Sequence, residues 1–481
     1  MLNIFKKKAV KVTTAPSRRM VIQVPIRSNK YDAAQTTTKN EKHWSMADSL
    51  GPNLSASPTV RATLRNRSRY ETANNSYCLG MVQTLADYQV GTGPTLQMLT
   101  ADAKGNKVAE EEFNDWCEAV DFAQKLWTMR VGVAVDGEAF AVMITNPKLK
   151  TKVKLDFRLI EPEMVTTPLE EYTNPNVYDG IEYDKYGNVV AYYVLDEHPS
   201  DVRVSVKQTY TRYAAEHVLH WFKPLRAGQK RGIPETTPSL HLFANLRRYT
   251  GAVLSSAEVA AALALTLYTD APAGAEAADL EAMDVIDFDR QMATVLPEGW
   301  KLAQTQAEQP TTTYAEFKKE IINEIARGLN LPFNVAAGNS AGYNYASGRL
   351  DHQAFFKRNT VERCSLERCA TDRLFEAWMM EAVLWENYLP RSIRMLPKWK
   401  HQWFYDGDEH VDPTKEAAAQ DTHLKNHTTT YAEEYAKKGK DWQVEFEQVA
   451  KEKEEMERLG ITPADIENKN QQSKESANAE K

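Results

Sequence analysis

The sequence predicts an α+β protein in which a strand-rich module is followed by two long helices. Three observations carry this prediction. Apolar residues alternate with polar ones between about 131 and 222, which is typical of half-buried strands. Apolar stripes at helical spacing lie on both sides of that module, and the segment after Pro234 is rich in small residues. The 481 residues allow roughly two to four domains, and 42% hydrophobic residues supply a sizeable core.

Charge and cysteine content exclude several classes of protein. A net charge of −7 argues against a protein held on nucleic acid mainly by neutralising phosphates. The four cysteines form no CxxC pair, which excludes a disulfide scaffold and a zinc ribbon and fits a reducing compartment. No signal peptide is visible, and the most apolar window, Val259–Tyr268, is too short to span a bilayer. We therefore expect a soluble, intracellular chain without a membrane segment.

The first part of the chain is predicted to be helical. Residues 1–45 are polar and basic, so we expect a flexible arm. Helices are predicted over Arg61–Met81, which carries four arginines in its first nine positions, and over Glu110–Val131. Between them, VGTGPTLQM (Val90–Met98) should break the helix because it holds two glycines and a proline.

Strands are predicted next. Val131–Ile144 is apolar around a Gly-Glu turn, and every second residue from Val153 to Leu159 is apolar. Gly180–Pro199 predicts a hairpin, because two β-rich runs flank the turn-forming residues 184–188. A last strand is expected over Val218–Phe222.

Long helices dominate the rest. A helix of about 35 residues should follow Pro234, with a length of ~50 Å. The elements expected after it are an acidic Ala-rich segment at 270–290, short strands in 292–308, a helix at 314–329, a Gly/Asn/Tyr-rich loop at 332–348, a second long helix at 349–388, and C-terminal helices after Asp412 and around 429–438 and 441–458. The last residues, from about 468, predict a disordered tail.

No motif of catalysis or cofactor binding is found, so we expect no cofactor, no metal and no catalytic residue. Gly91-Thr92-Gly93-Pro94 lacks the third glycine of a dinucleotide fingerprint. His423 and His427 are spaced to share a helix face, but without further ligands we expect two exposed helix residues. Cys364 and Cys369 are expected to be buried or half-buried thiols. A hydrolase site assembled from distant positions is the alternative that the sequence leaves open.

Several segments, in collinear order over about residues 55–462, resemble the lambda-type portal proteins of tailed bacteriophages. The resembling segments are the Arg-rich helix leading to Asn74, VGTGPTLQ (90–97), DGEAFA (136–141), GIEYDKYGNVVAYYVLDEHP (180–199), HWFKPLRAGQKRGIP (220–234), LPEGW (296–300), TYAEFKKEIINEIARGLNLPF (313–333), YNYASGRL (343–350), VDPTKEAAA (411–419) and KKGKDWQVEFEQVAKEKEEMERLGI (437–461). Each segment is weak by itself, but their joint order is specific.

The resemblance implies a ring of identical subunits, usually a dodecamer, at one vertex of the capsid. Double-stranded DNA would pass through its channel during packaging and ejection without sequence specificity. The implied partners are the terminase, the major capsid protein and scaffold, and later the head-completion and tail proteins. Such a protein belongs to the virion, is assembled in the cytoplasm of the bacterial host, and has no catalytic activity of its own.

The resemblance also divides the chain into the parts of the portal fold. These parts are an arm at 1–45, a wing with the β-rich module at 46–235, a stem helix at 236–269, a small clip at 270–312, a second stem helix at 313–331, a tunnel loop at 332–347, an inner wing with a long helix at 348–400, crown helices at 401–466 and a tail at 467–481.

Candidate DNA-facing residues follow from this division. The tunnel loop offers uncharged polar side chains, and the second stem helix offers two lysines; the candidates are Asn339, Ser340, Tyr343, Asn344, Tyr345, Lys318 and Lys319. Gly338, Gly342 and Gly348 are the expected hinges of the loop. The alternative is an ordinary flexible loop and a solvated helix face. A channel for any DNA sequence should avoid hydrogen bonds to base edges, and a negative net charge favours sliding over tight binding.

Two other classes of function remain as alternatives. A Mg²⁺-dependent DNA-processing enzyme with an unrecognised acidic site would cleave DNA as a monomer. A helical scaffold or adaptor of another assembly would form no ring with a hole as wide as duplex DNA.

Overall fold

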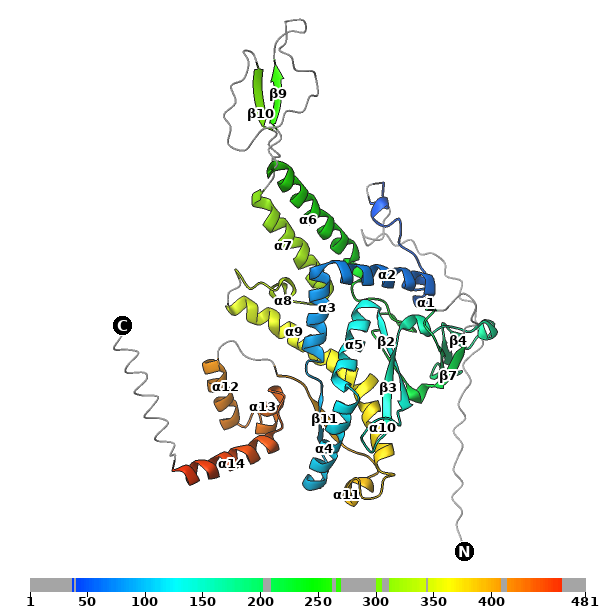
Figure 1. Ribbon diagram of the computed structural model, residues 1–481, viewed down its shortest axis with the longest axis vertical. Helices are drawn as coiled ribbons and strands as arrows, with labels where there is room; N and C mark the ends of the chain where they lie inside the picture. The colour runs from blue at the N-terminus through cyan, green and yellow to red at the C-terminus, as the bar shows by residue number, and fades with distance from the viewer. Residues whose placement is uncertain are drawn as a thin grey trace, which may run out of the picture. The chain divides into compact units, whose positions relative to one another are not determined.

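The computed structural model describes residues 37–38, 40–201, 209–261, 265–269, 300–304, 311–342, 345–407 and 413–460. The chain divides into two compact units, Met1–Gly51 and Pro52–Lys481. The described part of the first unit contains a short 3₁₀ helix, η2 (Glu41–His43). The second unit contains all the strands and the longer helices of the described residues (Figure 1). The expected arm and tail fall largely outside the described residues.

Two helices replace the single helix expected over Arg61–Met81. After the short α1 (Pro52–Ser55), α2 spans Pro58–Asn74 and α3 spans Ser76–Gln89. Asn75 between them is extended, and its side-chain oxygen accepts hydrogen bonds from the amides of Tyr77 and Cys78. An asparagine that caps a new helix in this way ends the preceding one. The pair Asn74-Asn75 indicates this boundary in the sequence, but we predicted one continuous helix across it.

The helix expected over Glu110–Val131 is also divided. α4 spans Ala103–Ala119 and α5 spans Phe122–Val135, so residues 131–135 are helical rather than part of a strand. The break lies at Asp121, whose φ of 53° is left-handed. Helices cannot continue through such a residue. Asp102 caps the start of α4 by accepting a hydrogen bond from the Gly105 amide.

Two antiparallel sheets form the strand-rich module. The first has the order β3-β2-β8, and the second has the order β4-β5-β6-β7. The strands are β2 (Glu138–Thr145), β3 (Leu155–Ile160), β4 (Val177–Tyr178), β5 (Ile181–Tyr183), β6 (Val189–Leu195), β7 (Tyr210–Ala214) and β8 (Val218–Phe222). Short 3₁₀ helices connect them, namely η3 (Pro162–Met164), η4 (Leu169–Glu171) and η5 (Ala215–His217).

The strands and hairpin expected from 153 to 222 are confirmed. β5 and β6 pair across the turn at 184–188, where Asp184 accepts hydrogen bonds from the amides of Tyr186 and Asn188. Gly187 has a φ of 88°, which favours glycine. β2 is the central strand of its sheet, so both of its edges are paired.

The long helix expected to end at 269 is shorter. α6 covers Leu240–Ala261 after η6 (Thr237–Ser239), and its 22 residues correspond to ~33 Å. Residues 265–269 instead form β9 (Leu265–Thr269), which pairs antiparallel with β10 (Trp300–Gln304). A strand within 292–308 was therefore predicted, whereas its partner was not. The acidic segment 270–290 lies outside the described residues.

The next helices follow the prediction more closely. α7 (Thr311–Gly328) packs against α6, where Tyr249 contacts the rings of Tyr314 and Phe317. The second long helix begins at Tyr345 and ends at Ala382, whereas the prediction placed its end at 388. It is interrupted by one segment of π-helix. Its parts are α9 (Tyr345–Leu366), η7 (Glu367–Thr371) and α10 (Asp372–Ala382).

The C-terminal segments return to the first half of the chain. After α11 (Arg391–Arg394), β11 (His401–Phe404) pairs antiparallel with β1 (Thr95–Met98), a pairing that the sequence did not predict. The C-terminal helices are α12 (Pro413–Lys425), α13 (Tyr431–Lys437) and α14 (Trp442–Leu459), and the last two confirm the prediction. Asp412, the expected cap of α12, lies outside the described residues.

The largest hydrophobic core joins α4 and α5 to the first sheet and to α10. Phe113 lies inside it, with its ring centroid 5.2 Å from those of Trp116 and Trp378. A second core packs α3, α6, α7 and α8 around Phe243 and Phe355. Among the described residues, no helix combines the length and the apolar character that crossing a bilayer requires.

Candidate functional site

The two candidate lysines lie on α7 but have different surroundings. The Lys318 ammonium is 5.2 Å from the ring centroid of Tyr77 on α3, and its side chain is half-buried. Lys319 is exposed and lies 5.5 Å from the centroid of the Phe333 ring on α8. Both charges can therefore be held by aromatic faces of their own chain. Lys319 is the more accessible of the two to a passing polyanion.

Residues 332–348 are less of a loop than expected. Phe333–Ala337 form α8, and α9 already begins at Tyr345. Gly348 therefore lies within a helix, and its assignment as a hinge is wrong. The described residues after α8, 338–342, are exposed, and the position of α8 beside α9 can be followed in Figure 1.

Two of the three expected glycine hinges have the backbone that glycine favours. Gly338 ends α8 with a φ of 61°, and Gly342 has a φ of 82°. Nothing lies within 4 Å of the position that a Cβ atom would take at either glycine. Backbone conformation, rather than crowding, is thus what requires glycine there.

The polar loop candidates are only partly brought together. Asn339 and Ser340 are exposed, and the Asn339 side chain accepts a hydrogen bond from the Ala341 amide at 2.9 Å. Tyr345 is the first residue of α9. Tyr343 and Asn344 lie outside the described residues.

A hollow with three cationic side chains, beside the connection between α7 and α8, was missed by the sequence reasoning. It has a volume of about 500 Å³ and lies between α7 and α9. Its cationic side chains are those of Arg327, Lys357 and Arg358. The spacing of Lys357 and Val361 on the exposed side of α9 is the signal that could have indicated it.

A buried ion-pair network holds the first sheet to the loop before α6. Glu138 on β2 is fully buried and accepts hydrogen bonds from Arg231 and from the Gly232 amide. His220 on β8 lies 3.2 Å from the same carboxylate. Burial raises the pKa of Glu138, but the charge of Arg231 outweighs burial and holds it well below its usual range. This network accounts for two of the resembling segments, DGEAFA and KPLRAGQKRGIP.

Three of the four arginines of α2 are paired within the chain, whereas Arg67 is exposed. Arg61 pairs with Asp179, Arg65 lies 3.0 Å from Glu163, and Arg69 lies 2.7 Å from Asp136. Burial and the neighbouring Arg231 lower the pKa of Arg61 to about 10. Arg61, Arg65 and Arg69 therefore stabilise the fold and are not free to bind phosphate.

A second network joins α5 to α9. Arg130 donates to Glu235 at 2.8 Å, and Lys223 bridges Glu235 and Glu362, at 2.7 Å from the latter. Burial raises the pKa of Glu235, while Arg130 and Lys223 lower it to about 2. Glu235 therefore carries its charge in the folded protein.

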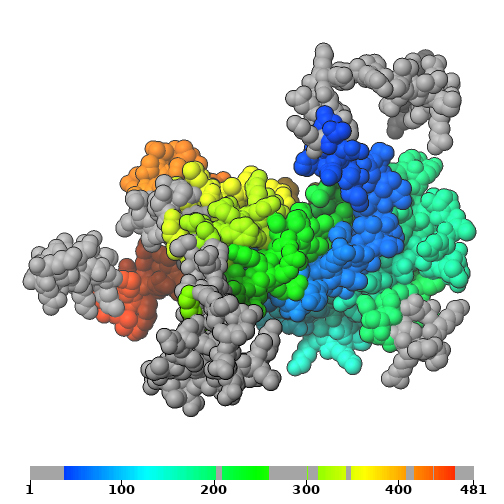
Figure 2. All heavy atoms as spheres, turned by 90° about the horizontal axis from the view of Figure 1, so that it is seen from above, coloured from blue at the N-terminus to red at the C-terminus, as the bar shows by residue number. Residues whose placement is uncertain are grey.

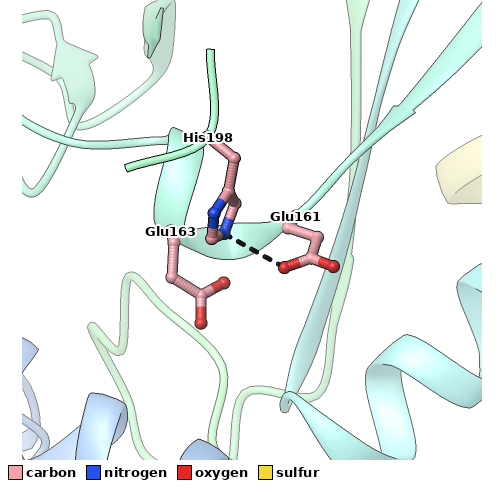
Figure 3. Close-up of side chains that lie close together, drawn as sticks. All are labelled: Glu161, Glu163 and His198. Atoms are coloured by element: carbon pink, nitrogen blue, oxygen red, sulfur yellow. Dashed lines mark ion pairs between the residues drawn. The ribbon is translucent and has the colours of Figure 1, made fainter. Parts of the chain in front are cut away.

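One group of possible metal ligands is assembled among the described residues, from Glu161, Glu163 and His198 (Figure 3). Their ligand atoms lie within 4.8 Å of one another, and His198 Nε2 is 3.2 Å from Glu161. Arg69, however, lies 3.3 Å from Glu161 and 2.9 Å from Glu163. A divalent cation would have to compete with this guanidinium, so the group functions as an ion-pair cluster. No local sequence motif indicates this group, because over thirty residues, including β4, β5 and β6, separate His198 from the glutamates.

The histidines and cysteines noted in the sequence also differ from expectation. His423 lies in the last turn of α12, but His427 follows the helix with a φ of 54°, so the two share no helix face. Cys364 is exposed rather than buried, whereas Cys369 is half-buried as expected.

The family model that matches and two curated relatives all carry the description portal protein. Residues 39–363 match the family described as "Phage portal protein, lambda family". The chain is 25% identical over 479 residues to the "Probable portal protein" of Halomonas phage phiHAP-1, covering 93% of this chain and 90% of that one. It is 23% identical to "Portal protein B" of Escherichia phage lambda, covering 81% and 83%.

Solved structures of gene transfer agent particles are also similar to the chain. A chain from the neck of the native particle, computed with C12 symmetry, has a TM-score of 0.46 and 12% identity, and the match covers 78% of this chain and 91% of that one. A chain from the virion of the native particle has a TM-score of 0.44 and 10% identity, with coverages of 84% and 99%.

Proposed function

The chain belongs to the lambda family of phage portal proteins, and we propose that copies of it form a dodecameric ring at one vertex of the capsid. Double-stranded DNA would enter through this ring during packaging and leave through it during ejection. The observation that carries the proposal is the family match, which runs from residue 39 to residue 363. Relatives named as portal proteins match over most of both chains, which supports the same role for the whole chain.

The parts of the ring follow from the order of elements. We assign residues 46–235 to the wing, the antiparallel helices α6 and α7 to the stem, and residues 270–312 to the clip. α9, η7 and α10 would belong to the inner wing, and the helices after 401 to the crown. The aromatic contacts of Tyr249 with α7 support the pairing of the two stem helices.

DNA would pass α7 and the exposed turn at 338–342. Asn339 and Ser340 offer uncharged polar contacts there, and Lys319 offers one accessible cation. Few strong ionic contacts suit a channel, because each phosphate neutralised adds to the affinity that resists sliding. Three of the four arginines of α2 form ion pairs with carboxylates of the same chain, which is consistent with this requirement.

Partners would bind at the two ends of the ring. We propose that the clip binds the terminase during packaging and the head-completion and tail proteins afterwards. The wing would contact the major capsid protein and scaffold when the procapsid begins to assemble. None of these roles requires catalysis by the chain itself.

Electron microscopy of the purified protein, with its mass in solution, tests the proposal. We expect rings whose central hole admits duplex DNA, about 20 Å across, and a mass near twelve chains. A chain that stays monomeric at every salt and protein concentration, and that cleaves DNA when Mg²⁺ is added, would contradict the proposal and favour a DNA-processing enzyme.

The role of the stem lysines is tested by charge removal. The double variant Lys318→Gln with Lys319→Gln should form normal rings but package DNA at a changed rate, because cations near the path alter the DNA affinity. The matched control is Lys148→Gln with Lys150→Gln, which removes two exposed lysines from the β2–β3 loop. Equal packaging rates for both variants would exclude Lys318 and Lys319 from the DNA path.

A further inference from the structure

The exposed side of α9 has an unusual composition. Apolar and cationic side chains recur along it at helical spacing and continue into η7, namely Leu350, Ala354, Lys357, Val361, Cys364 and Arg368. Leu350 is 68% exposed and Val361 is 51% exposed. α7 to α9 lie open on the surface in Figure 2, in yellow-green and yellow. Such a stripe on a soluble domain normally packs against another element.

A hollow of about 500 Å³ runs along this stripe. It is bounded on one side by Lys357 and Val361 of α9 and by Arg368 of η7, and on the other by Leu225, which is 80% exposed. We call these four residues, with Cys364, the basic face. Within the part of the chain that the structure describes, no ion pair reaches Lys357 or Arg368. Arg358, by contrast, forms an ion pair with Glu362, one turn further along α9.

A second surface, with charge of the opposite sign, is formed by α4 and its junction with α5. Glu111, Asp115 and Glu118 recur at helical spacing on the exposed side of α4, and Asp121 follows at the junction. We call these four residues the acidic face. A hollow of about 580 Å³ adjoins it, lined by Glu118, Asp121 and Pro94 among others. Within the described residues, none of the four carboxylates forms an ion pair, although Lys107 lies near enough to Glu111 for their charges to attract each other.

From these two surfaces we infer that the basic face of one copy of the chain docks on the acidic face of the next copy in the ring. The inference rests on the proposed function, because it presumes that a ring forms. A closed ring is built by head-to-tail contacts, in which each subunit presents two different surfaces that complement each other. The two faces have opposite, unpaired charges and lie on different elements, as this geometry requires.

The apolar residues of the basic face favour a protein partner over DNA. Leu225 and Val361 are exposed between the cations. Apolar side chains that become buried at the centre of an interface supply much of the binding energy, and surrounding charges set partner choice and orientation. A phosphate backbone would leave these apolar side chains in water. We therefore assign the cations to subunit contact and not to the DNA path.

Charge reversal tests the pairing. The variants Lys357→Glu with Arg368→Glu, and Glu111→Lys with Glu118→Lys, should each raise the protein concentration needed for half assembly by roughly a hundredfold, because like charges would face each other. Combining all four substitutions should restore assembly. The control Lys148→Glu with Lys150→Glu makes the same change of charge away from both faces and should assemble normally. Thermal melting of each variant establishes that the subunit is folded.

The outcomes separate this inference from the proposed function. Wild-type rings together with normal rings of the Lys357→Glu, Arg368→Glu variant would overturn the inference and leave the ring intact. Failure of the fourfold variant to recover, with each subunit folded, would show that the two faces do not meet. A wild-type chain that forms no ring under any condition would contradict the proposed function itself.

Cross-linking provides a second readout. The exposed thiol of Cys364 lies in the basic face. In the variant Glu118→Cys, a short bismaleimide should link this thiol to the new one on the next subunit and give a ladder of covalent multimers. Adding Cys364→Ser should abolish the ladder. A ladder that persists without Cys364 would overturn the pairing of the two faces, because it would arise from other thiols.

Discussion

At the scale of single residues, the chain places many of its charges where they serve the fold. Glu138 and Arg231 are almost completely inaccessible and satisfy each other through several hydrogen bonds. Arg231 also donates to the carbonyl groups of Val165 and Pro162, both at 3.1 Å. Breaking a buried pair costs more than the pair contributes net, because the remaining charge is stranded.

Replacing Arg231 should therefore strongly lower the stability of the folded chain. We expect Arg231→Ala to lower the free energy of unfolding by roughly 3–5 kcal/mol, because Glu138 would be left buried without its partner. Arg212→Ala is the control, since it breaks an exposed pair with Glu182 and should cost about 1 kcal/mol or less. Urea denaturation measures both, and equal losses would contradict a special role for the buried pair.

The second network makes stability depend on pH. The pKa of Glu235 is about 2 in the folded chain, below the ordinary value of 4.5. A carboxyl whose folded pKa is depressed stabilises the fold above its unfolded pKa and loses that contribution as the pH falls toward the folded value. Between about pH 5 and about pH 3, the wild type should thus lose more unfolding free energy than Glu235→Gln. Parallel pH profiles of the two proteins would exclude this carboxyl as a source of acid sensitivity.

At the scale of elements, single residues decide where helices begin and end. Asn75 caps α3 and also donates to the Phe243 carbonyl on α6. It therefore sets both the break after α2 and the contact between two parts of the chain. Asp121 separates α4 from α5 through its left-handed backbone.

The Asn75 cap of α3 should make a measurable contribution to the stability of the protein. Asn75→Ala should lower the free energy of unfolding by about 1–2 kcal/mol, since two helical amides lose their acceptor. Asn74→Ala changes the neighbouring exposed residue and should cost under about 0.5 kcal/mol. Chemical denaturation of both variants checks the difference, and a larger loss for Asn74 would place the cap elsewhere.

The turn between α8 and α9 offers a matched glycine pair. Gly338→Ala should destabilise the protein by about 1 kcal/mol, because alanine is disfavoured at a φ of 61°. Gly348→Ala should stabilise it by up to about 1 kcal/mol, because Gly348 lies in the helical backbone of α9. Thermal denaturation measures the signs, and a destabilising Gly348→Ala would restore Gly348 as a hinge.

At the scale of the whole molecule, the main core ties together residues that are far apart in the chain. It extends in sequence from Val90 to Tyr405 and includes Phe113 of α4 and Phe375 of α10, whose ring centroids are 5.5 Å apart. The pairing of β1 with β11 fastens the same two regions. Elements assigned to the wing and to the inner wing therefore share one core.

A shared core should unfold cooperatively. Phe113→Ala should lower the free energy of unfolding by roughly 3–5 kcal/mol, and far-UV circular dichroism and tryptophan fluorescence should fall at the same denaturant concentration. Phe317→Ala, at a position that is 52% exposed, should have a smaller effect. Separate transitions by the two probes would indicate that the two regions unfold independently.

The sequence by itself determined the features that depend on neighbours in the chain. Alternation from Val153 to Leu159 predicted β3, and the turn residues at 184–188 predicted the β5–β6 hairpin. The ordered series of weak segments indicated the portal family, which the family match then established. Such signals are local, or collinear along the chain, and can be read without knowing what a side chain contacts.

Only the tertiary structure decided which side chains meet. It paired β1 with β11 and β9 with β10, and brought Glu161 and Glu163 together with His198 although three strands lie between them in the chain. Among the described residues, it also left Glu118 on α4 and Lys357 on α9 exposed and outside any ion pair. No local pattern separates these charges from those of α2, because a charge is neutralised by whatever residue the fold brings within a few ångströms of it.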